Sequence, residues 1–378
     1  MTIPRVALAT GSLHLPGKHF VLDHSLELTD RVETKLFTYA ARGTDYPSLD
    51  MRELFAPMKV PYDLRRRLYP IGSRSLGRSI LRWNPDIIHL HFMALGGFAA
   101  RASKSGRVPL ITTVHALEPH LMNTPRTQRD RNLRQQCLEV LEATTLFLPV
   151  SEYIRQWLIS LGVPKTSIAV NYLGIDTEFW QPRRAPDRIE GNPHLLFVGN
   201  LTELKGIREL IDVSVDLLEG VPHTLDVVGD GPLRDYVDAM ARKHPHIKVH
   251  GLCSRERVRN LMHHSHVFAL PTHTHNGISE AASFVLMEAQ SMGLATVCFQ
   301  VGGTAEMMAD PSLLVKEGDT NALTEVLLEL LTLDEAALRL LGKAARDWIV
   351  QNRSLRAGAR STLGHYRSAV ASDAHDAS

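Results

Sequence analysis

The sequence lacks any run of about 18 consecutive uncharged apolar residues, the length a helix needs to cross a membrane. Its first residues, MTIPRVALATGS, also lack the charged segment followed by an apolar run that is typical of a secretory leader. From these two absences we expect a chain that acts in the cytoplasm.

Cysteine is scarce, with three residues among 378: Cys137, Cys253 and Cys298. They are far apart and odd in number, so they match neither a disulfide framework nor paired zinc-ligand spacing, and we expect free thiols. Aromatic residues make up only 6% of the chain, and no segment interleaves basic with aromatic residues. This argues against a nucleic acid as partner.

Positive charge is concentrated in one segment, although the net charge of the chain is only +1. The segment Arg65–Arg82 holds six arginines and no acidic residue. Three of them, Arg74, Arg78 and Arg82, recur every four residues and would form one stripe on a helix. Such a face is either simply solvated or rests on an anionic membrane surface, and both interpretations stay open.

Short apolar runs alternate with helical patterns along the whole chain, six in each half. We expect strands at 5–10, 35–39, 86–90, 109–114, 145–150, 167–173, 194–199, 223–229, 246–251, 266–271, 294–299 and 312–315. Continuous apolar strands separated by helices indicate parallel sheets that are covered on both faces. The sequence therefore predicts an α/β fold of two doubly wound, Rossmann-like domains.

A polar, proline-rich stretch at 181–193 separates the two sets of runs, and the tail from Ser372 onward is small and polar. In open parallel sheets, ligands bind beyond the carboxyl ends of the strands. With two such sheets in one chain, we expect the domains to face each other and to bind the ligand in the cleft between them.

The segment 278–308 contains two acidic residues at a spacing of eight, Glu280 and Glu288. Helical spacing begins near Ser283, so the amides of Ser283, Phe284 and Val285 would form a helix N-terminus that attracts phosphate. A carboxylate before those amides could hold sugar hydroxyls, and one farther into the helix could accept a hydrogen bond from a ribose. The plain alternative is an acid at a helix start followed by an ordinary helix glutamate.

A second candidate element is the strand LLFVG followed by NLTELKG at 200–206. A glycine at a strand end with Lys205 near a helix start could anchor a pyrophosphate, because an ammonium group can neutralise a departing phosphate. Taken alone, Lys205 could equally be an ordinary surface lysine.

Taken together, the motifs resemble the retaining family-4 glycosyltransferases, which have the GT-B fold. The matching segments in the second half are GNLTELKG (199–206), GDGPL (229–233), EAASFVLME (280–288) and VGGTAE (301–306). Those in the first half are PDIIHLHFMALGG (85–97), PLITTVHALE (109–118) and the run from 150 to 180.

The resemblance implies a role for each matching residue. Lys205 would bind and stabilise the donor diphosphate, Glu280 would hold hydroxyls of the donor sugar, and Glu288 would hold the ribose. His115 would approach the donor sugar from the other domain. The further substrate contacts implied by the resemblance are Gly17, Asn200, Leu252, Ser283, Phe284 and Val285.

The same resemblance implies domains at 1–180 on the acceptor side and at 194–350 on the donor side, then a C-terminal helix and frayed tail at 351–378 that returns to the first domain. The implied reaction moves a hexose from a nucleotide diphosphate-sugar to a glycan or lipid-linked acceptor, with retention, no metal and no cofactor. The enzyme would be cytoplasmic or peripheral at the inner face of the membrane. Two alternatives remain: a nucleotide-sugar epimerase, and a non-catalytic relative that binds sugar nucleotides.

One departure makes the second alternative plausible, since Asn200 stands where the family usually has arginine, although the presence of Lys205, Glu280, Glu288 and His115 argues against it. Losing one charge-assisted contact would cost about 1.5–3 kcal/mol of diphosphate binding. We expect a nearby arginine such as Arg208 to replace it. Ala281, Ala282 and Ser283 also fill positions where many members carry glycine, which restricts how closely the backbone meets phosphate.

Other ligand chemistries are less well supported. Five histidines, at 263, 264, 266, 273 and 275, lie near one another in sequence but without a cysteine or carboxylate at ligand spacing, so we expect no metal. The GDGP turn lacks the third glycine and the later acidic residue of a dinucleotide fold, which argues against NAD.

Overall fold

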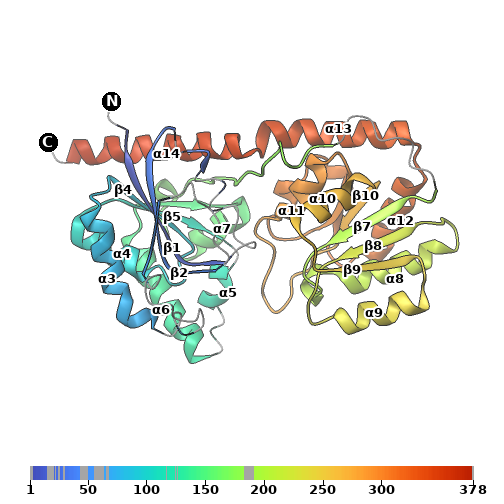
Figure 1. Ribbon diagram of the computed structural model, residues 1–378, viewed down its shortest axis with the longest axis horizontal. Helices are drawn as coiled ribbons and strands as arrows, with labels where there is room; N and C mark the ends of the chain where they lie inside the picture. The colour runs from blue at the N-terminus through green and yellow to red at the C-terminus, as the bar shows by residue number, and fades with distance from the viewer. Residues whose placement is uncertain are drawn as a thin grey trace. The chain divides into compact units, whose positions relative to one another are not determined.

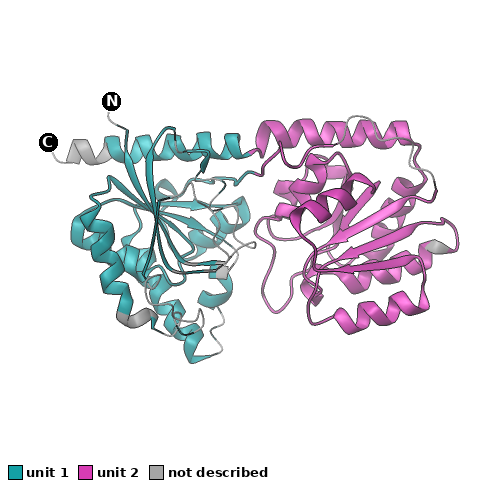
Figure 2. Cartoon of the chain, in the orientation of Figure 1, with its two compact units in different colours: residues 1–174, 355–378 teal, residues 175–354 magenta. Residues whose placement is uncertain are grey.

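The computed structural model divides into two compact units, drawn in different colours in Figure 2. Unit 1 comprises Met1–Gly174 and Leu355–Ser378, and unit 2 comprises Ile175–Ser354. The structure describes residues 3–14, 30–42, 50–54, 68–115, 117–123, 127–182 and 191–376, with the isolated positions 21, 23, 26–28, 64 and 125. Among these residues, no helix is both long enough and apolar enough to cross a membrane.

Unit 1 is built on a parallel sheet in the order β3-β2-β1-β4-β5-β6 (Figure 1). Its strands are β1 (Arg5–His14), β2 (Glu33–Arg42), β3 (Met51–Glu53), β4 (Ile87–His91), β5 (Leu110–Val114) and β6 (Leu146–Pro149). Its helices are α3 (Tyr69–Arg82), α4 (Gly97–Gly106), α5 (Leu117–Asn123), α6 (Gln128–Ala143), α7 (Glu152–Ser160) and α14 (Leu355–Asp376).

Unit 2 repeats the same arrangement, in the order β12-β11-β10-β7-β8-β9 (Figure 1). Its strands are β7 (His194–Val198), β8 (Thr224–Val228), β9 (Ile247–Gly251), β10 (Val267–Leu270), β11 (Ala295–Gln300) and β12 (Leu314–Lys316). Its helices are α8 (Ile207–Leu218), α9 (Arg234–Lys243), α10 (Arg255–His263), α11 (Phe284–Ser291), α12 (Thr320–Thr332) and α13 (Glu335–Asn352).

The predicted α/β class with two doubly wound sheets is confirmed. The central strands are buried along their whole length, as in β4 and β5, which is what helices on both faces of a sheet require. The strand order reverses between β1 and β4 in unit 1 and between β7 and β10 in unit 2. These switch points are where open α/β sheets bind ligands, at the carboxyl ends of their strands.

One of the predicted strands is not a strand in the structure, and one strand of the structure was not predicted. The segment 167–173 lies beside β6, where the Ala169 and Asn171 amides donate to β6 carbonyls, but it forms a single bridge, between Ile168 and Phe147. The side chain of Asn171 instead donates to Thr362 on α14. The true sixth strand, β3, is a three-residue edge strand that is too short to produce an apolar run.

The last helix, α14, belongs to unit 1 although the rest of that unit ends at Gly174. Its residues Ala359, Leu363 and Tyr366 are part of the buried cluster that includes β1 and β4. The Tyr366 hydroxyl lies 2.6 Å from Nδ1 of His89 on β4, so the helix is joined to the sheet by a polar contact as well as by packing.

Candidate functional site

Three turns at the carboxyl ends of β7, β8 and β9 are joined backbone to backbone in unit 2. The Leu201 amide donates to the Asp230 carbonyl at 3.0 Å, and the Gly229 amide donates to the Gly251 carbonyl at 2.9 Å. Gly229 has a φ of 141°, and a Cβ there would lie 1.9 Å from the Gly199 carbonyl oxygen. Only glycine therefore allows these turns to approach so closely.

Lys205 ends a short 3₁₀ turn, Glu203–Lys205, directly before α8. Gly206 follows in the left-handed region, at a φ of 68°, and a Cβ there would lie 1.8 Å from the Pro271 carbonyl oxygen. This glycine thus brings the Lys205 turn against the exit of β10. In this position the Lys205 ammonium pairs with the Glu280 carboxylate, and both side chains are mostly buried.

The position of Glu280 is fixed by the Gly-Gly turn after β11. The Gly303 amide donates to the Glu280 carbonyl at 2.8 Å. Gly302 has a φ of 54°, and a Cβ there would lie 2.1 Å from the same carbonyl oxygen. The motifs that hold Lys205 and Glu280, although 75 residues apart, therefore converge on one charged pair at the switch-point edge of the sheet.

Helix α11 begins at Phe284, one residue after the predicted start. Ser283, at the N-cap, is extended and buried, and its side chain makes no capping hydrogen bond. The first turn contains no acidic residue of its own that would offset the partial positive charge of this helix end. Val285 is half-buried in that first turn, and Glu288 is half-buried one turn farther on.

The other predicted contacts in unit 2 are at the surface. Asn200 is exposed in the turn after β7, and Leu252, after β9, is 84% exposed. Arg208 donates to both oxygens of Glu203, at 2.9 and 3.1 Å, and its guanidinium lies 4.0 Å from the centroid of the Tyr236 ring. Arg208, which was expected to replace the family's usual cation, is thus paired with Glu203 and lies over the Tyr236 ring.

The sequence analysis did not predict a histidine–glutamate pair, His273 and Glu209, that lies next to the Lys205 turn. The His273 amide donates to the Leu204 carbonyl at 2.8 Å, and its Nε2 lies 3.1 Å from the Glu209 carboxylate. The interaction with Glu209 raises the pKa of His273 above its ordinary value. The only signal in the sequence was a histidine three residues after the end of a buried strand, and no spacing connected it with Glu209 on α8.

Unit 1 carries the remaining predicted residues. His115 is buried directly after β5, and its ring stacks on that of Phe92, with 4.0 Å between centroids. Gly17 and the three arginines at 65–67 lie outside the residues that the structure describes.

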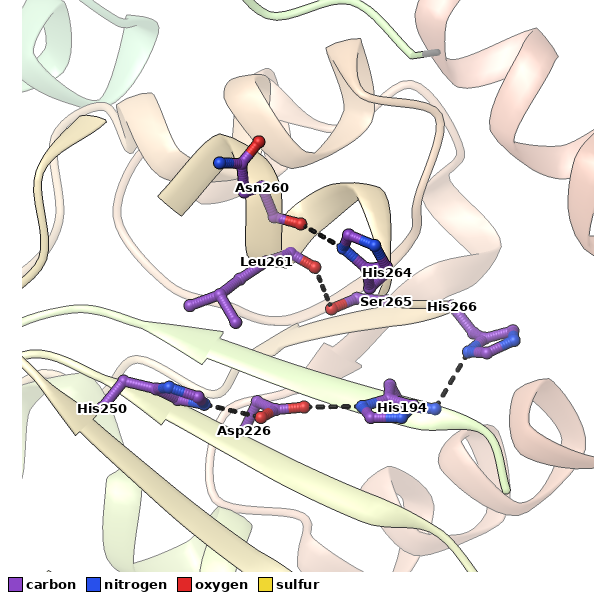
Figure 3. A network of polar contacts seen from close by, with 8 residues as sticks. All are labelled: His194, Asp226, His250, Asn260, Leu261, His264, Ser265 and His266. Carbon is purple, nitrogen blue, oxygen red and sulfur yellow. Dashed lines mark hydrogen bonds and ion pairs between the residues drawn. The ribbon is translucent and has the colours of Figure 1, made fainter. Parts of the chain in front are cut away.

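Among the histidines considered for a metal, Nδ1 of His266 accepts from the His194 amide at 2.9 Å, and Nδ1 of His264 lies 2.6 Å from the Asn260 carbonyl oxygen. Figure 3 shows the row of His250, Asp226, His194 and His266 across the sheet, with His250 and His194 at 2.6 and 2.7 Å from the two oxygens of Asp226. Burial alone would raise the pKa of Asp226, but the hydrogen bonds from both imidazoles outweigh it and lower that pKa. No group of three His, Cys, Asp or Glu residues in the described ranges is arranged to hold a metal ion.

The geometry can be compared with known proteins. The family model of Glycosyltransferase Family 4 matches residues 18–179, and that of Glycosyl transferases group 1 matches residues 192–333. The chain belongs to the family-4, group 1 glycosyltransferases. It is therefore a nucleotide-sugar-dependent glycosyltransferase.

Among curated relatives, the putative colanic acid biosynthesis glycosyltransferase WcaL of Escherichia coli is 28% identical, over 75% of this chain and 72% of the relative. The amylovoran biosynthesis glycosyltransferase AmsK of Erwinia amylovora is 27% identical over 58% of this chain, and the match spans about half, 52%, of its length. Among solved structures, Anabaena Alr3699/HepE in complex with UDP has a TM-score of 0.76 at 18% identity, covering 96% of this chain and all of that one. The architecture is therefore that of the GT-B glycosyltransferases.

Proposed function

We propose that this glycosyltransferase moves a hexose from a nucleotide diphosphate-sugar to a hydroxyl of a glycan or lipid-linked glycan acceptor, with retention at the anomeric carbon. The observation that carries the proposal is the convergence of Lys205, Glu280 and the N-terminus of α11 at one edge of the unit 2 sheet. The names of the relatives in colanic acid and amylovoran biosynthesis favour a polysaccharide as the eventual product.

The roles follow from charge. The ammonium of Lys205 and the amide groups at the start of α11 are positive elements, and a departing nucleoside diphosphate gains negative charge as the glycosidic bond to the sugar breaks. Glu280 accepts hydrogen bonds from hydroxyls of the sugar, and Glu288 from those of the ribose. This scheme needs no metal, because protein groups neutralise the leaving phosphate.

The test is turnover of UDP-glucose, UDP-galactose, GDP-mannose and ADP-glucose, each with and without a lipid-linked oligosaccharide, followed by mass spectrometry. A transferase releases nucleotide and lengthens the acceptor. An epimerase changes the sugar without any acceptor, and a non-catalytic binder leaves the donor intact. Either of the last two results would overturn the proposal.

A membrane-bound acceptor also gives a role to the arginine stripe on α3. Arg74, Arg78 and Arg82 are all exposed, and none forms an ion pair with any described residue. Each arginine near an anionic surface contributes about 1 kcal/mol of attraction. We expect the protein to sediment with phosphatidylglycerol vesicles but not with phosphatidylcholine vesicles, and the triple change of these residues to glutamine to abolish the difference. This contact would place the enzyme at the cytoplasmic face of a membrane.

A further inference from the structure

A fully buried carboxylate lies beside the strand ends of unit 1. Glu118, in the first turn of α5, has no exposed surface. It accepts hydrogen bonds from the backbone amide of Met93 at 2.8 Å and from that of His115 at 3.2 Å. Burying a charge costs free energy unless hydrogen bonds compensate it, so the bonds from these two amides help to stabilise the buried Glu118 carboxylate.

The two amides belong to different loops. Met93 lies in the loop that leaves β4, and His115 directly follows β5, the neighbouring parallel strand. Both loops are at the carboxyl edge of the sheet, and β4 is one of the two strands at the switch point of unit 1. One carboxylate therefore sets the spacing of two loops at the edge where this fold binds ligands.

The β4 loop is also held from its other side and is strained. Gly11 on β1 lies so close that a Cβ there would be 2.2 Å from Cβ of Leu95. Phe92 and Leu95 have φ values of 68° and 64°, in the left-handed region that bulky residues avoid. Such strain persists only where the surroundings fix the backbone, and it gathers at functional sites.

Capping of α5 explains the contact of Glu118 with His115 but not the contact with Met93. A glutamate in a first helical turn often accepts from an amide three residues earlier, as Glu118 does from His115. The bond to Met93 spans 25 residues, is the shorter of the two and contributes nothing to the helix. It connects the β4 loop, and with it the Phe92 ring, to the segment that carries His115.

We propose that Glu118 is a positioning residue for the transfer reaction, which holds the backbone of His115 while Phe92 holds its ring. The inference rests on the proposed function and on the role toward the donor sugar that the family resemblance predicts for His115. Glu118 itself touches no substrate. Its removal should therefore lower the rate of transfer without changing the affinity of the donor site, whose predicted diphosphate and ribose ligands are in unit 2.

The test is Glu118→Gln, which keeps the side-chain shape but turns an amide NH₂ toward one of the two backbone N–H groups. We expect the amide proton resonances of Met93 and His115 to move upfield in a nitrogen-correlated spectrum. With whichever of UDP-glucose, UDP-galactose, GDP-mannose and ADP-glucose the wild type turns over, kcat should fall at least tenfold, while KM for that donor stays within twofold. The matched control is Glu142→Gln, since Glu142 pairs with the exposed Lys104, and it should change neither readout.

A folded Glu118→Gln variant with a kcat within twofold of the wild type, or with unmoved amide resonances, overturns the inference. So does a variant whose KM rises while kcat is kept. If Glu118→Gln does not fold, Phe92→Leu removes the stacked ring and leaves the carboxylate in place; it must lower kcat without raising KM, and wild-type turnover would again overturn the inference. A wild type that turns over none of the four donors overturns the proposed function, while the amide shifts still report whether Glu118 holds the two loops.

Discussion

At the scale of single residues, the central feature is the ion pair between Lys205 and Glu280. The sequence predicted both residues as donor ligands, but it did not predict that they contact each other, because they are 75 residues apart and two glycine-dependent loop contacts bring them together. If Lys205 binds the diphosphate, the carboxylate of Glu280 competes with the phosphates for its ammonium. Before a donor binds, the ion pair thus gives each of the two mostly buried charges a partner.

Changing Glu280 to glutamine should therefore separate binding from catalysis. Lys205 loses its competing anion, so we expect the tightest of UDP, GDP and ADP to bind about two- to fivefold more strongly, roughly 0.4–1 kcal/mol. Transfer should fall about tenfold or more, because a charge-assisted contact to the sugar is lost. Calorimetry and a turnover assay measure the two effects.

The neighbouring carboxylate provides the contrast. Glu288→Gln removes the predicted ribose acceptor without freeing Lys205, so nucleotide affinity should fall. If Glu280→Gln weakens nucleotide binding as Glu288→Gln does, Glu280 does not compete for Lys205.

At the scale of elements, the sequence predicted eleven of the twelve named strands, because buried parallel strands read as continuous apolar runs. It also predicted the start of α11 to within one residue. It failed at 167–173, where an apolar segment lies beside β6 without a full ladder, and at the short edge strand β3. It also could not show which loops touch. That information is in the left-handed glycines 206, 229 and 302, each of which faces a backbone carbonyl of another segment.

Gly206→Ala tests whether such a close approach builds the site. The left-handed backbone alone costs an alanine roughly 1–2 kcal/mol, and the 1.8 Å approach to the Pro271 oxygen adds a clash that only a backbone shift relieves. We expect a lower thermal midpoint and at least a tenfold loss of nucleotide affinity, because Lys205 is the preceding residue.

Gly318→Ala is the matched control, since Gly318 has a φ of 79° and a Cβ added there would meet nothing within 4 Å. Gly318→Ala should lose only the stability that a left-handed backbone costs an alanine, and it should bind nucleotide as the wild type does. Equal losses of stability in the two variants would show that the contact with Pro271 is unimportant.

At the scale of the whole molecule, we expect histidines of unit 2 to make the stability of the protein depend on pH. Ser214, on α8, lies 2.8 Å from Nε2 of His223 and 3.1 Å from Nε2 of His246. Burial, together with the positive neighbours His223, His244 and Lys248, lowers the pKa of His246 to about 4. His273 acts in the opposite sense. Its pKa is raised, so the protonated imidazole stabilises the fold, and this contribution is lost as pH rises.

The sign of the His246 effect follows from proton binding. In the unfolded chain a histidine has a pKa of about 6.5, so between about pH 6.5 and 4 the unfolded state binds more protons than the folded state. The free energy of unfolding should therefore fall as pH drops through this range. In His246→Gln, the side-chain amide still donates to Ser214 but does not titrate, so the loss of thermal midpoint between about pH 7.5 and 5 should shrink. An unchanged loss would assign the acid sensitivity to other groups.

The central claim is that unit 2 binds the diphosphate of a sugar nucleotide through Lys205. The most direct test is calorimetric titration of UDP, GDP and ADP into the wild type, Lys205→Ala and, as a control for charge, Lys343→Ala, which changes an exposed lysine on α13. We predict that one nucleotide binds clearly more tightly than the others, that Lys205→Ala weakens it about tenfold or more, roughly 1.4 kcal/mol, and that Lys343→Ala leaves it unchanged. Failure of all three nucleotides to bind at millimolar concentration, or equal affinities for the wild type and Lys205→Ala, would contradict the claim.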